Sequence, residues 1–217
     1  MEKVFLFFIS LPCIIVIYQE RKKLKEAFLA PFRKKGAIYI LISAVSLTLA
    51  FGDGNMKIPS VKPLTHLGNA IGNGKKLLPA IITGICLTSI TKLERAETAL
   101  RRAFVSGIAA GVIADIIKIG TSRARPWVGN KLDWFRYDKI TDPDYWSFPS
   151  GHTALASGVF FSLYLSVKGA WRYIFFPLPF IVAISRVAVG AHWFSDVVFS
   201  LLIGFIIASG GDKREGA

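Results

Sequence analysis

The chain has 217 residues, of which 53% are hydrophobic, and a formal net charge of +13. This length suits one domain, and the apolar fraction together with a positive mean hydropathy exceeds that of ordinary soluble domains, which favours a membrane protein. The charge would also suit nucleic acid, but the sequence has no soluble basic module to bind it, so anionic lipid is the expected partner.

Seven apolar blocks approach the roughly 20 residues that a helix needs to cross a bilayer. They lie at Val4–Tyr18, Ala37–Phe51, Leu77–Thr91, Ala103–Gly120, Thr153–Val167, Tyr173–Val189 and Phe194–Ser209. The last six predict transmembrane helices, whereas the first is short and contains Pro12, so it fits either a span or an interfacial segment. The expected fold class is all-α, a polytopic membrane helical bundle of six core transmembrane helices plus an additional N-terminal hydrophobic helix. No repeat or long linker divides the chain, so residues 1–217 are expected to form a single integral-membrane domain.

Lysine and arginine residues cluster in alternate connections between these blocks, which predicts that those connections are cytoplasmic. They lie at residues 21–35, 92–102, 168–172 and 213–214. The connections at 52–76, 121–152 and 190–193 then face outward. We therefore expect a bacterial inner-membrane protein whose outer loops lie in the periplasm.

Aromatic and basic residues alternate in the outer segment Trp127–Trp146. Aromatic rings prefer the headgroup level of a bilayer, where the cations would meet phosphates. The segment is expected to lie in the interface, either resting on the membrane or contacting a substrate.

Three groups of polar residues fall at outward-facing ends of the predicted spans, where ionisable groups are costly and often functional. The first group is Lys118 with Arg125-Pro126. A lysine point charge and a forked arginine suit the several oxygens of a phosphoryl group. Contact with bulk lipid would account for the same two cations.

The second group is Pro149-Ser150-Gly151-His152, directly before the block that starts at Thr153. Ser150 is predicted to cap this helix, whose free amides and dipole would then form an anion site beside His152. An ordinary helix cap with an interfacial histidine is the alternative.

The third group is Ser185-Arg186, followed after five residues by His192 and after three more by Asp196. The four-residue spacing predicts that His192 and Asp196 share a helix face, so that the carboxylate holds the imidazole and its free nitrogen can attack. A structural His–Asp pair in a bundle is the alternative.

Taken together, the K-x6-R-P, P-S-G-H and S-R-x5-H-x3-D series resembles the type-2 phosphatidic acid phosphatase superfamily, which includes membrane lipid phosphatases and vanadium haloperoxidases. The similarity covers roughly Lys118 to Asp196, within a motif-bearing core at about 103–209. The resemblance implies that His192 is a nucleophile forming a phosphohistidine, that Asp196 orients it and that His152 is the general acid. It also implies a set of phosphate-binding residues, namely Lys118, Arg125, Ser150, Gly151 and Arg186.

No metal or other cofactor is expected, because the remaining histidine, His66, has no close Cys, Asp or Glu of ligand spacing. The resemblance implies a phosphatase that removes phosphate from a lipid headgroup at the periplasmic face. Further cations in the outer loops favour a multiply charged headgroup, with the 1-phosphate of lipid A as the preferred substrate. These cations are Lys57, Lys62, Lys75, Lys76, Lys131, Arg136 and Lys139. Phosphatidylglycerol phosphate and undecaprenyl pyrophosphate are the alternatives, as is a lipid phosphotransferase that uses the same intermediate. The oligomeric state is not indicated.

Overall fold

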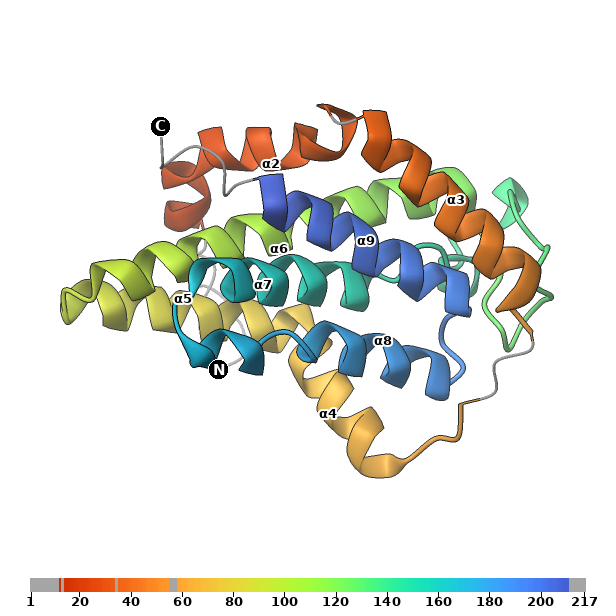
Figure 1. Cartoon of the computed structure of the whole chain (residues 1–217). Coiled ribbons are helices and arrows are strands. Elements are labelled where there is room, and N and C mark those ends of the chain that lie inside the picture. The colour runs from red at the N-terminus through yellow and green to blue at the C-terminus, as the bar shows by residue number, and fades with distance from the viewer. Residues whose placement is uncertain (1–11, 13, 34, 55–57, 211–217) are drawn as a thin grey trace.

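The computed structural model describes residues 12, 14–33, 35–54 and 58–210, and all regular structure within these ranges is helical (Figure 1). The predicted all-α class is therefore confirmed. The helices are α2 (Arg21–Arg33), α3 (Lys35–Phe51), α4 (Lys62–Gly72), α5 (Gly74–Ile90), α6 (Glu94–Thr121), α7 (Gly151–Ser166), α8 (Leu178–Ala188) and α9 (Phe194–Gly210). Three short 3-10 turns join them, η1 (Tyr137–Lys139), η2 (Pro143–Tyr145) and η3 (Ala170–Ile174).

Each of the six later apolar blocks coincides with a helix: α3, α5, α6, α7, η3 with α8, and α9. Two helical stretches in the described residues, Glu94–Thr121 and Ala170–Ala188, are long and apolar enough to cross a membrane, and α9 is a shorter apolar helix. The number of six membrane-crossing helices stays a prediction. The N-terminal block Val4–Tyr18 lies for the most part outside the described residues.

Helix α7 forms the centre of the bundle, with α6 and α9 packed against it (Figure 1). Glycines permit this close approach, because a Cβ at Gly158 would lie 2.4 Å from the carbonyl oxygen of Ser106, and one at Gly204 would lie 2.3 Å from the Cβ of Ser157. Small residues at such contacts are typical of helices that associate by packing within a membrane. The three helices therefore form a rigid frame for the residues at their ends.

Two helices were not anticipated in segments that the sequence marks as connections. In helix α2, Ala27 packs in the core that is formed with α6 and α9, while the lysines of the helix are exposed. Helix α4 starts with Pro63 in its first turn and packs on α8, where a Cβ at Gly68 would lie only 2.1 Å from the hydroxyl of Ser185. A search for long apolar blocks misses both helices, because each buries only one side.

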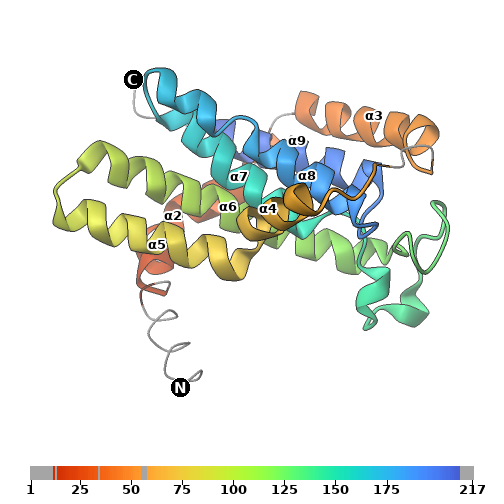
Figure 2. The same ribbon diagram turned by 90° about the horizontal axis from the view of Figure 1, so that it is seen from below.

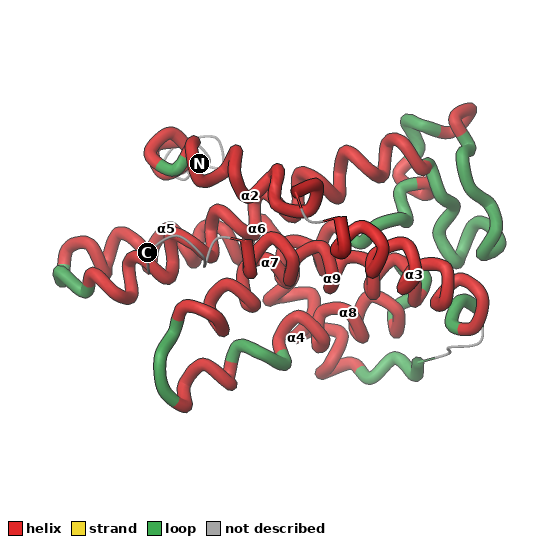
Figure 3. The backbone as a smooth tube through the Cα atoms, turned by 45° about the horizontal axis from the view of Figure 1, so that its top comes forward, coloured by secondary structure: helices red, strands yellow, loops and turns green. Residues whose placement is uncertain are grey.

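Several helix ends meet at one end of the bundle, together with the long connection between α6 and α7 (Figures 1 and 2). These are the C-terminal ends of α3, α6 and α8 and the N-terminal ends of α7 and α9. Figure 3 shows the same connection as the largest loop region of the molecule, lying beside these helix ends. The opposite end carries the turn between α5 and α6.

Candidate active site

All eight residues that the three sequence motifs single out lie at this end of the bundle. Lys118 is in the last turn of α6, Arg125 in the loop after it, Ser150, Gly151 and His152 at the start of α7, Arg186 in the last turn of α8, His192 just before α9, and Asp196 in the first turn of α9. Residues separated by up to 78 positions in the sequence, from Lys118 to Asp196, are thus brought to one region of the fold.

His192 is buried, with 4% of its surface exposed, and its Nδ1 lies 2.7 Å from the carbonyl oxygen of Ser147. The same nitrogen is 3.5 Å from Oδ2 of Asp196, which is an ion-pair distance rather than a close hydrogen bond. The expectation that His192 and Asp196 share a helix face is wrong, because α9 begins only at Phe194 and His192 belongs to the preceding loop. The main contact that orients the imidazole is therefore a backbone carbonyl.

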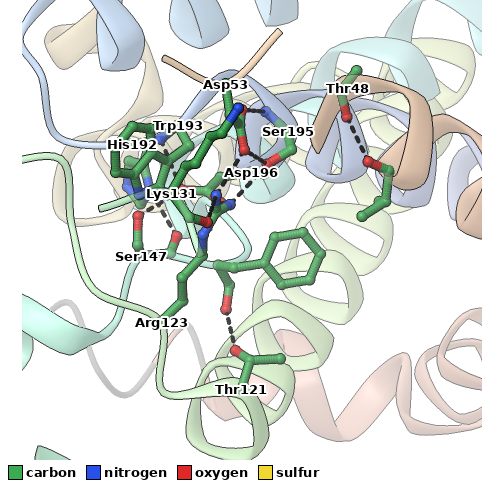
Figure 4. A network of polar contacts seen from close by, with 12 residues as sticks. Thr48, Asp53, Thr121, Arg123, Lys131, Ser147, His192, Trp193, Ser195 and Asp196 are labelled. Atoms are coloured by element: carbon green, nitrogen blue, oxygen red, sulfur yellow. Dashed lines mark hydrogen bonds and ion pairs between the residues drawn. The ribbon is translucent and has the colours of Figure 1, made fainter. Parts of the chain in front are cut away.

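The carboxylate of Asp196 is fully buried and accepts hydrogen bonds on both oxygens (Figure 4). Oδ2 accepts from the hydroxyl of Ser147 at 2.5 Å and from the backbone N–H of Trp193 at 2.9 Å. Oδ1 accepts from Nη1 of Arg123. Such bonds stabilise the ionised carboxylate, so a fixed negative charge lies beside His192.

The ammonium group of Lys118 lies close to the start of α7. A Cβ at Gly151 would lie 2.7 Å from the Nζ atom of Lys118, so the absence of a side chain at this position leaves room for the ammonium group. Nζ also forms an ion pair of 2.8 Å with Oδ1 of Asp115, whose side chain is largely exposed. Lys118 therefore places a positive charge beside the N-terminus of α7.

The start of α7 differs in one respect from the expected cap. Ser150 occupies the N-cap position, but its hydroxyl makes no capping hydrogen bond and instead accepts from Thr153 at 3.0 Å. The first backbone N–H groups of an α-helix lack intrahelical partners, so the amides of Gly151 and His152 are free to bind an anion.

Two arginines complete the positive side of the site. Arg125 donates from Nη1 to the carbonyl oxygen of Ala191 at 3.1 Å, which ties its loop to the residue before His192. Burial lowers the pKa of Arg125, while the charges of Asp144 and Asp196 oppose this effect, and a guanidinium stays protonated at neutral pH. Arg186 is 9% exposed, and its Nε donates to the hydroxyl of Ser185 at 3.3 Å.

A buried ion network lies behind Asp196, and sequence reasoning missed it (Figure 4). Arg123 has no exposed surface and bridges Asp196 to Asp53, whose Oδ2 lies 2.7 Å from Nη2. The Arg123 guanidinium also stacks over Trp134, 4.2 Å from the ring centroid. Arg123 stands two residues before the recognised Arg125-Pro126, and Asp53 stands two residues after the apolar block that ends at Phe51. In the sequence, only the charge of each residue near a predicted span marked them.

The outer segment Trp127–Trp146 provides structural contacts as well as exposed aromatic side chains. Trp127, Phe135 and Tyr137 are each more than half exposed. Hydrogen bonds to Asp138 and Asp133 raise the pKa of Arg136, and Arg136 lowers the pKa of Asp138. Arg136 is thus engaged within its own loop.

A pocket of about 310 Å³ reaches His192 and is lined by residues of α8, α9 and the segment after α3. An apolar cavity of about 480 Å³ lies between α8 and α9 and shares Ile58, Val187 and Phe194 with that pocket. Its walls are hydrocarbon, including Phe180, Leu201 and Phe205. The polar site therefore adjoins an apolar space.

In the part of the chain that the structure describes, no group of three His, Cys, Asp or Glu side chains is arranged to hold a metal ion. His66, the third histidine, is exposed on α4.

Residues 99–210 match the model of the PAP2 superfamily. This match spans more than half of the chain, and the chain belongs to the PAP2 superfamily. It is a phosphatase, and the motif residues described above all lie within the matching region.

Similar proteins include the lipid A 1-phosphatases of two bacteria. The protein of Rhizobium johnstonii is 28% identical over 192 residues, covering 80% of this chain and 78% of that protein. The protein of Rhizobium etli is 29% identical over 193 residues, covering 80% of this chain and 82% of that protein.

Two solved structures are also similar. The crystal structure of Aquifex aeolicus LpxE has a TM-score of 0.50 and 24% identity, with 68% of this chain and 82% of that chain covered, which supports the fold. The first transmembrane PAP2-type phosphatidylglycerolphosphate phosphatase from Bacillus subtilis has a TM-score of 0.48 and 20% identity, with 92% and 96% covered.

Proposed function

We propose that this chain removes a phosphate group from the headgroup of an anionic membrane lipid through a phosphohistidine on His192. The observation that carries the proposal is a buried imidazole, held at Nδ1 by a backbone carbonyl, in a site that also contains the cations of Lys118, Arg125 and Arg186. Such cations stabilise the charge that develops on the equatorial oxygens of a phosphoryl group during transfer.

In the first step, Nε2 of His192 attacks phosphorus and the bond to the leaving oxygen breaks. His152 donates a proton to that oxygen, which leaves as the dephosphorylated lipid. In the second step, His152 accepts a proton from water, the water oxygen attacks phosphorus, and the bond from Nε2 to phosphorus breaks to release inorganic phosphate. The electrostatic interactions of His152 with His192, Arg186, Lys118 and Arg125 support its place in the same site.

The phosphate oxygens would bind to Lys118, Arg125, Arg186, the hydroxyl of Ser150 and the amide of Gly151. Asp196 would stabilise the positive charge that forms on His192 after attack. No step in this scheme requires a metal ion. A chelator is therefore expected to leave the rate of hydrolysis unchanged.

The apolar cavity beside the site supports a lipid substrate over a soluble phosphate ester. It shares three residues with the pocket that contains His192, so a substrate phosphate at His192 would place an attached acyl chain against hydrocarbon walls. The apolar helices suit a chain whose substrate stays in the bilayer during catalysis.

Among lipids we favour the 1-phosphate of lipid A. The names of the two rhizobial relatives support this choice, as do exposed lysines such as Lys75 and Lys76 at the start of α5. Arg136 contributes less than expected, because it pairs with Asp133 and Asp138. Lys57 lies outside the described residues.

We further propose that the chain is one integral-membrane domain in the bacterial inner membrane, with six core spans and the active site facing the periplasm. The alternation of basic connections supports this orientation. The orientation is tested by substituting an exposed residue of the outer segment Trp127–Trp146 with cysteine. Spheroplasts that contain this variant are then treated with a membrane-impermeant thiol reagent, which should label it. Labelling that requires disruption of the membrane would contradict the orientation.

Phosphate release from purified protein tests the function, with lipid A, phosphatidylglycerol phosphate and undecaprenyl pyrophosphate as substrates and no added acceptor. We expect release from lipid A, unaffected by chelator and inhibited competitively by vanadate. If phosphate is released only from another lipid, that lipid replaces lipid A as the proposed substrate. If a lipid loses its phosphate only when an acceptor is added, and the phosphate is recovered on the acceptor, the chain is a phosphotransferase.

The nucleophile is tested in the same assay with His192→Ala, which is expected to lower kcat by at least about 10³-fold. His66→Ala is the matched control, since His66 is an exposed histidine outside the site. Full activity of His192→Ala would refute the assignment.

A further inference from the structure

We propose that Asp53 is a positioning residue of this active site, which acts through Arg123 to hold Asp196 beside His192. The inference rests on the proposed role of His192 as the nucleophile. Asp53 follows α3 and lies outside the region that matches the PAP2 superfamily, so the motifs do not include it.

The network that carries the inference is sealed from solvent. Asp53 is 1% exposed, and Arg123 and Asp196 have no exposed surface. Buried carboxylates are rare unless they are paired, because removing a charge from water is costly. The Asp53 carboxylate is therefore stabilised in this core by its ion pair and hydrogen bonds, which replace its solvation by water.

The carboxylate of Asp53 accepts three hydrogen bonds, two from Ser195 at the start of α9 and one from Arg123 (Figure 4). Its Oδ1 accepts from the backbone N–H of Ser195 at 2.8 Å. Its Oδ2 accepts from the hydroxyl of Ser195 at 2.6 Å and from Nη2 of Arg123 at 2.7 Å. The carboxylate thus fixes both the guanidinium and the residue next to Asp196.

Arg123 carries this restraint onward to Asp196. Its Nη1 donates to Oδ1 of Asp196 and to the hydroxyl of Ser195, the latter at 2.7 Å. Nη2 also donates to the carbonyl oxygen of Lys131 at 2.9 Å. With contacts on both terminal nitrogens, the guanidinium holds Asp196 in a single orientation.

The charges of the network explain why a second carboxylate is present. One guanidinium and two carboxylates sum to one net negative charge. Without Asp53, Arg123 would neutralise Asp196, and the imidazolium that forms on His192 would lose the net negative charge beside it. Asp53 therefore preserves the electrostatic effect of Asp196 on His192.

The substitution Asp53→Asn tests this role, because it removes the charge and changes the shape least. We expect kcat to fall at least tenfold while KM stays within twofold of the wild-type value, measured on the lipid that the phosphate-release panel identifies. The matched control is Asp138→Asn, which removes an exposed carboxylate in the outer loop and is expected to leave both constants unchanged.

A pH profile separates this role from a merely structural one. His192 interacts electrostatically with groups from α6, α7, α9 and the loop after α6, namely Lys118, His152, Asp196 and Arg125. Arg186 of α8 interacts with His152 and Arg125 in the same site. Loss of a negative charge behind Asp196 should move the acid limb of kcat/KM to lower pH in Asp53→Asn. An unshifted limb together with a wild-type kcat overturns the proposal.

A double-mutant cycle tests whether Asp53 acts through Arg123. In an Arg123→Gln background, Asp53→Asn should lower kcat much less than it does in the wild-type chain, since the bridge is already broken. Full additivity overturns the coupling. If Asp53→Asn is not recovered folded, Arg123→Lys decides, because it keeps the positive charge but removes the two terminal nitrogens that bridge Asp53 and Asp196. A wild-type kcat in that variant overturns the proposal.

The nucleophile and the positioning residue are distinguishable in one experiment. If His192→Ala is active, the proposed function fails. If His192→Ala is inactive while Asp53→Asn has wild-type kcat and pH dependence, only the present inference fails.

Discussion

The Nδ1 atom of His192 lies 2.7 Å from the carbonyl oxygen of Ser147. Because a carbonyl oxygen only accepts hydrogen bonds, Nδ1 carries the hydrogen in the neutral imidazole and the lone pair is on Nε2. The backbone of the loop before α7 thus selects the tautomer that can attack phosphorus. No substitution at Ser147 removes this carbonyl.

The pH dependence of activity follows from the burial of His192. Burial lowers the pKa of His192, against the opposing charge of Asp196. In the proposed mechanism the neutral imidazole is the nucleophile, so activity should be present above this pKa and be lost as pH falls through it. We expect the acid limb of kcat/KM to lie below the ordinary histidine value of about 6.5. A profile on the purified protein checks this, and a limb assigned to His192 above that value would contradict it.

Gly151→Ala should weaken substrate binding with little loss of stability. The new Cβ would meet Nζ of Lys118 at 2.7 Å, and the flexible lysine can move away from it. That movement takes a cation from the proposed phosphate site, so KM should rise about tenfold, which corresponds to about 1.4 kcal/mol. Gly120→Ala on α6 is the matched control, since a Cβ there meets nothing within 4 Å. An unchanged KM in Gly151→Ala would show that Lys118 does not contribute from this position.

Filling the apolar cavity should affect long-chain substrates selectively. Leu201→Trp adds volume to the wall between α8 and α9. We expect kcat/KM to fall about tenfold for a lipid phosphate with long acyl chains and to stay unchanged for a dihexanoyl analogue with the same headgroup. Leu87→Trp on α5 is the control, because Leu87 is 58% exposed outside the cavity. Equal losses with both substrates would argue against an acyl chain in the cavity.

Arg123→Ala should destabilise the fold strongly. It leaves the carboxylates of Asp53 and Asp196 buried without their shared cation, for which the cost is about 3–5 kcal/mol. Arg136→Ala removes a partly exposed arginine from surface ion pairs and should lower the melting temperature far less than Arg123→Ala does. Thermal unfolding in detergent compares the two variants. Similar melting temperatures would mean that the buried network adds little stability.

The sequence indicated the parts of this structure that depend on local pattern. Apolar blocks located the helices that carry Lys118 and Arg186, and the spacing of the motifs singled out His152 and His192. The placement of Ser150 at the N-cap was correct, whereas its hydroxyl bonds Thr153 rather than the backbone.

The sequence pattern did not predict contacts between segments that lie far apart in the chain. Nothing in the pattern near Asp53 indicates that it meets Arg123, 70 residues away. The expected pairing of His192 with Asp196 assumed a helix that starts before His192, but the helix starts after it, and the tertiary contact with Ser147 fixes the imidazole. Helix α2 escaped notice because its lysines and arginines mark it as a basic connection while its apolar side faces the core.

Helix α6 is longer than the hydrocarbon layer of a typical bilayer is thick. From Glu94 to Lys118 the helix rises about 36 Å, whereas the hydrocarbon layer of a typical bilayer is about 30 Å thick. If α6 crosses the membrane with Lys118 at one surface, its N-terminal part extends past the opposite surface, where Glu94 and Arg95 would meet water and headgroups. A bilayer much thicker than this span would draw those charges toward hydrocarbon or pull Lys118 inward from the proposed phosphate site, so bilayer thickness is expected to affect the rate of hydrolysis.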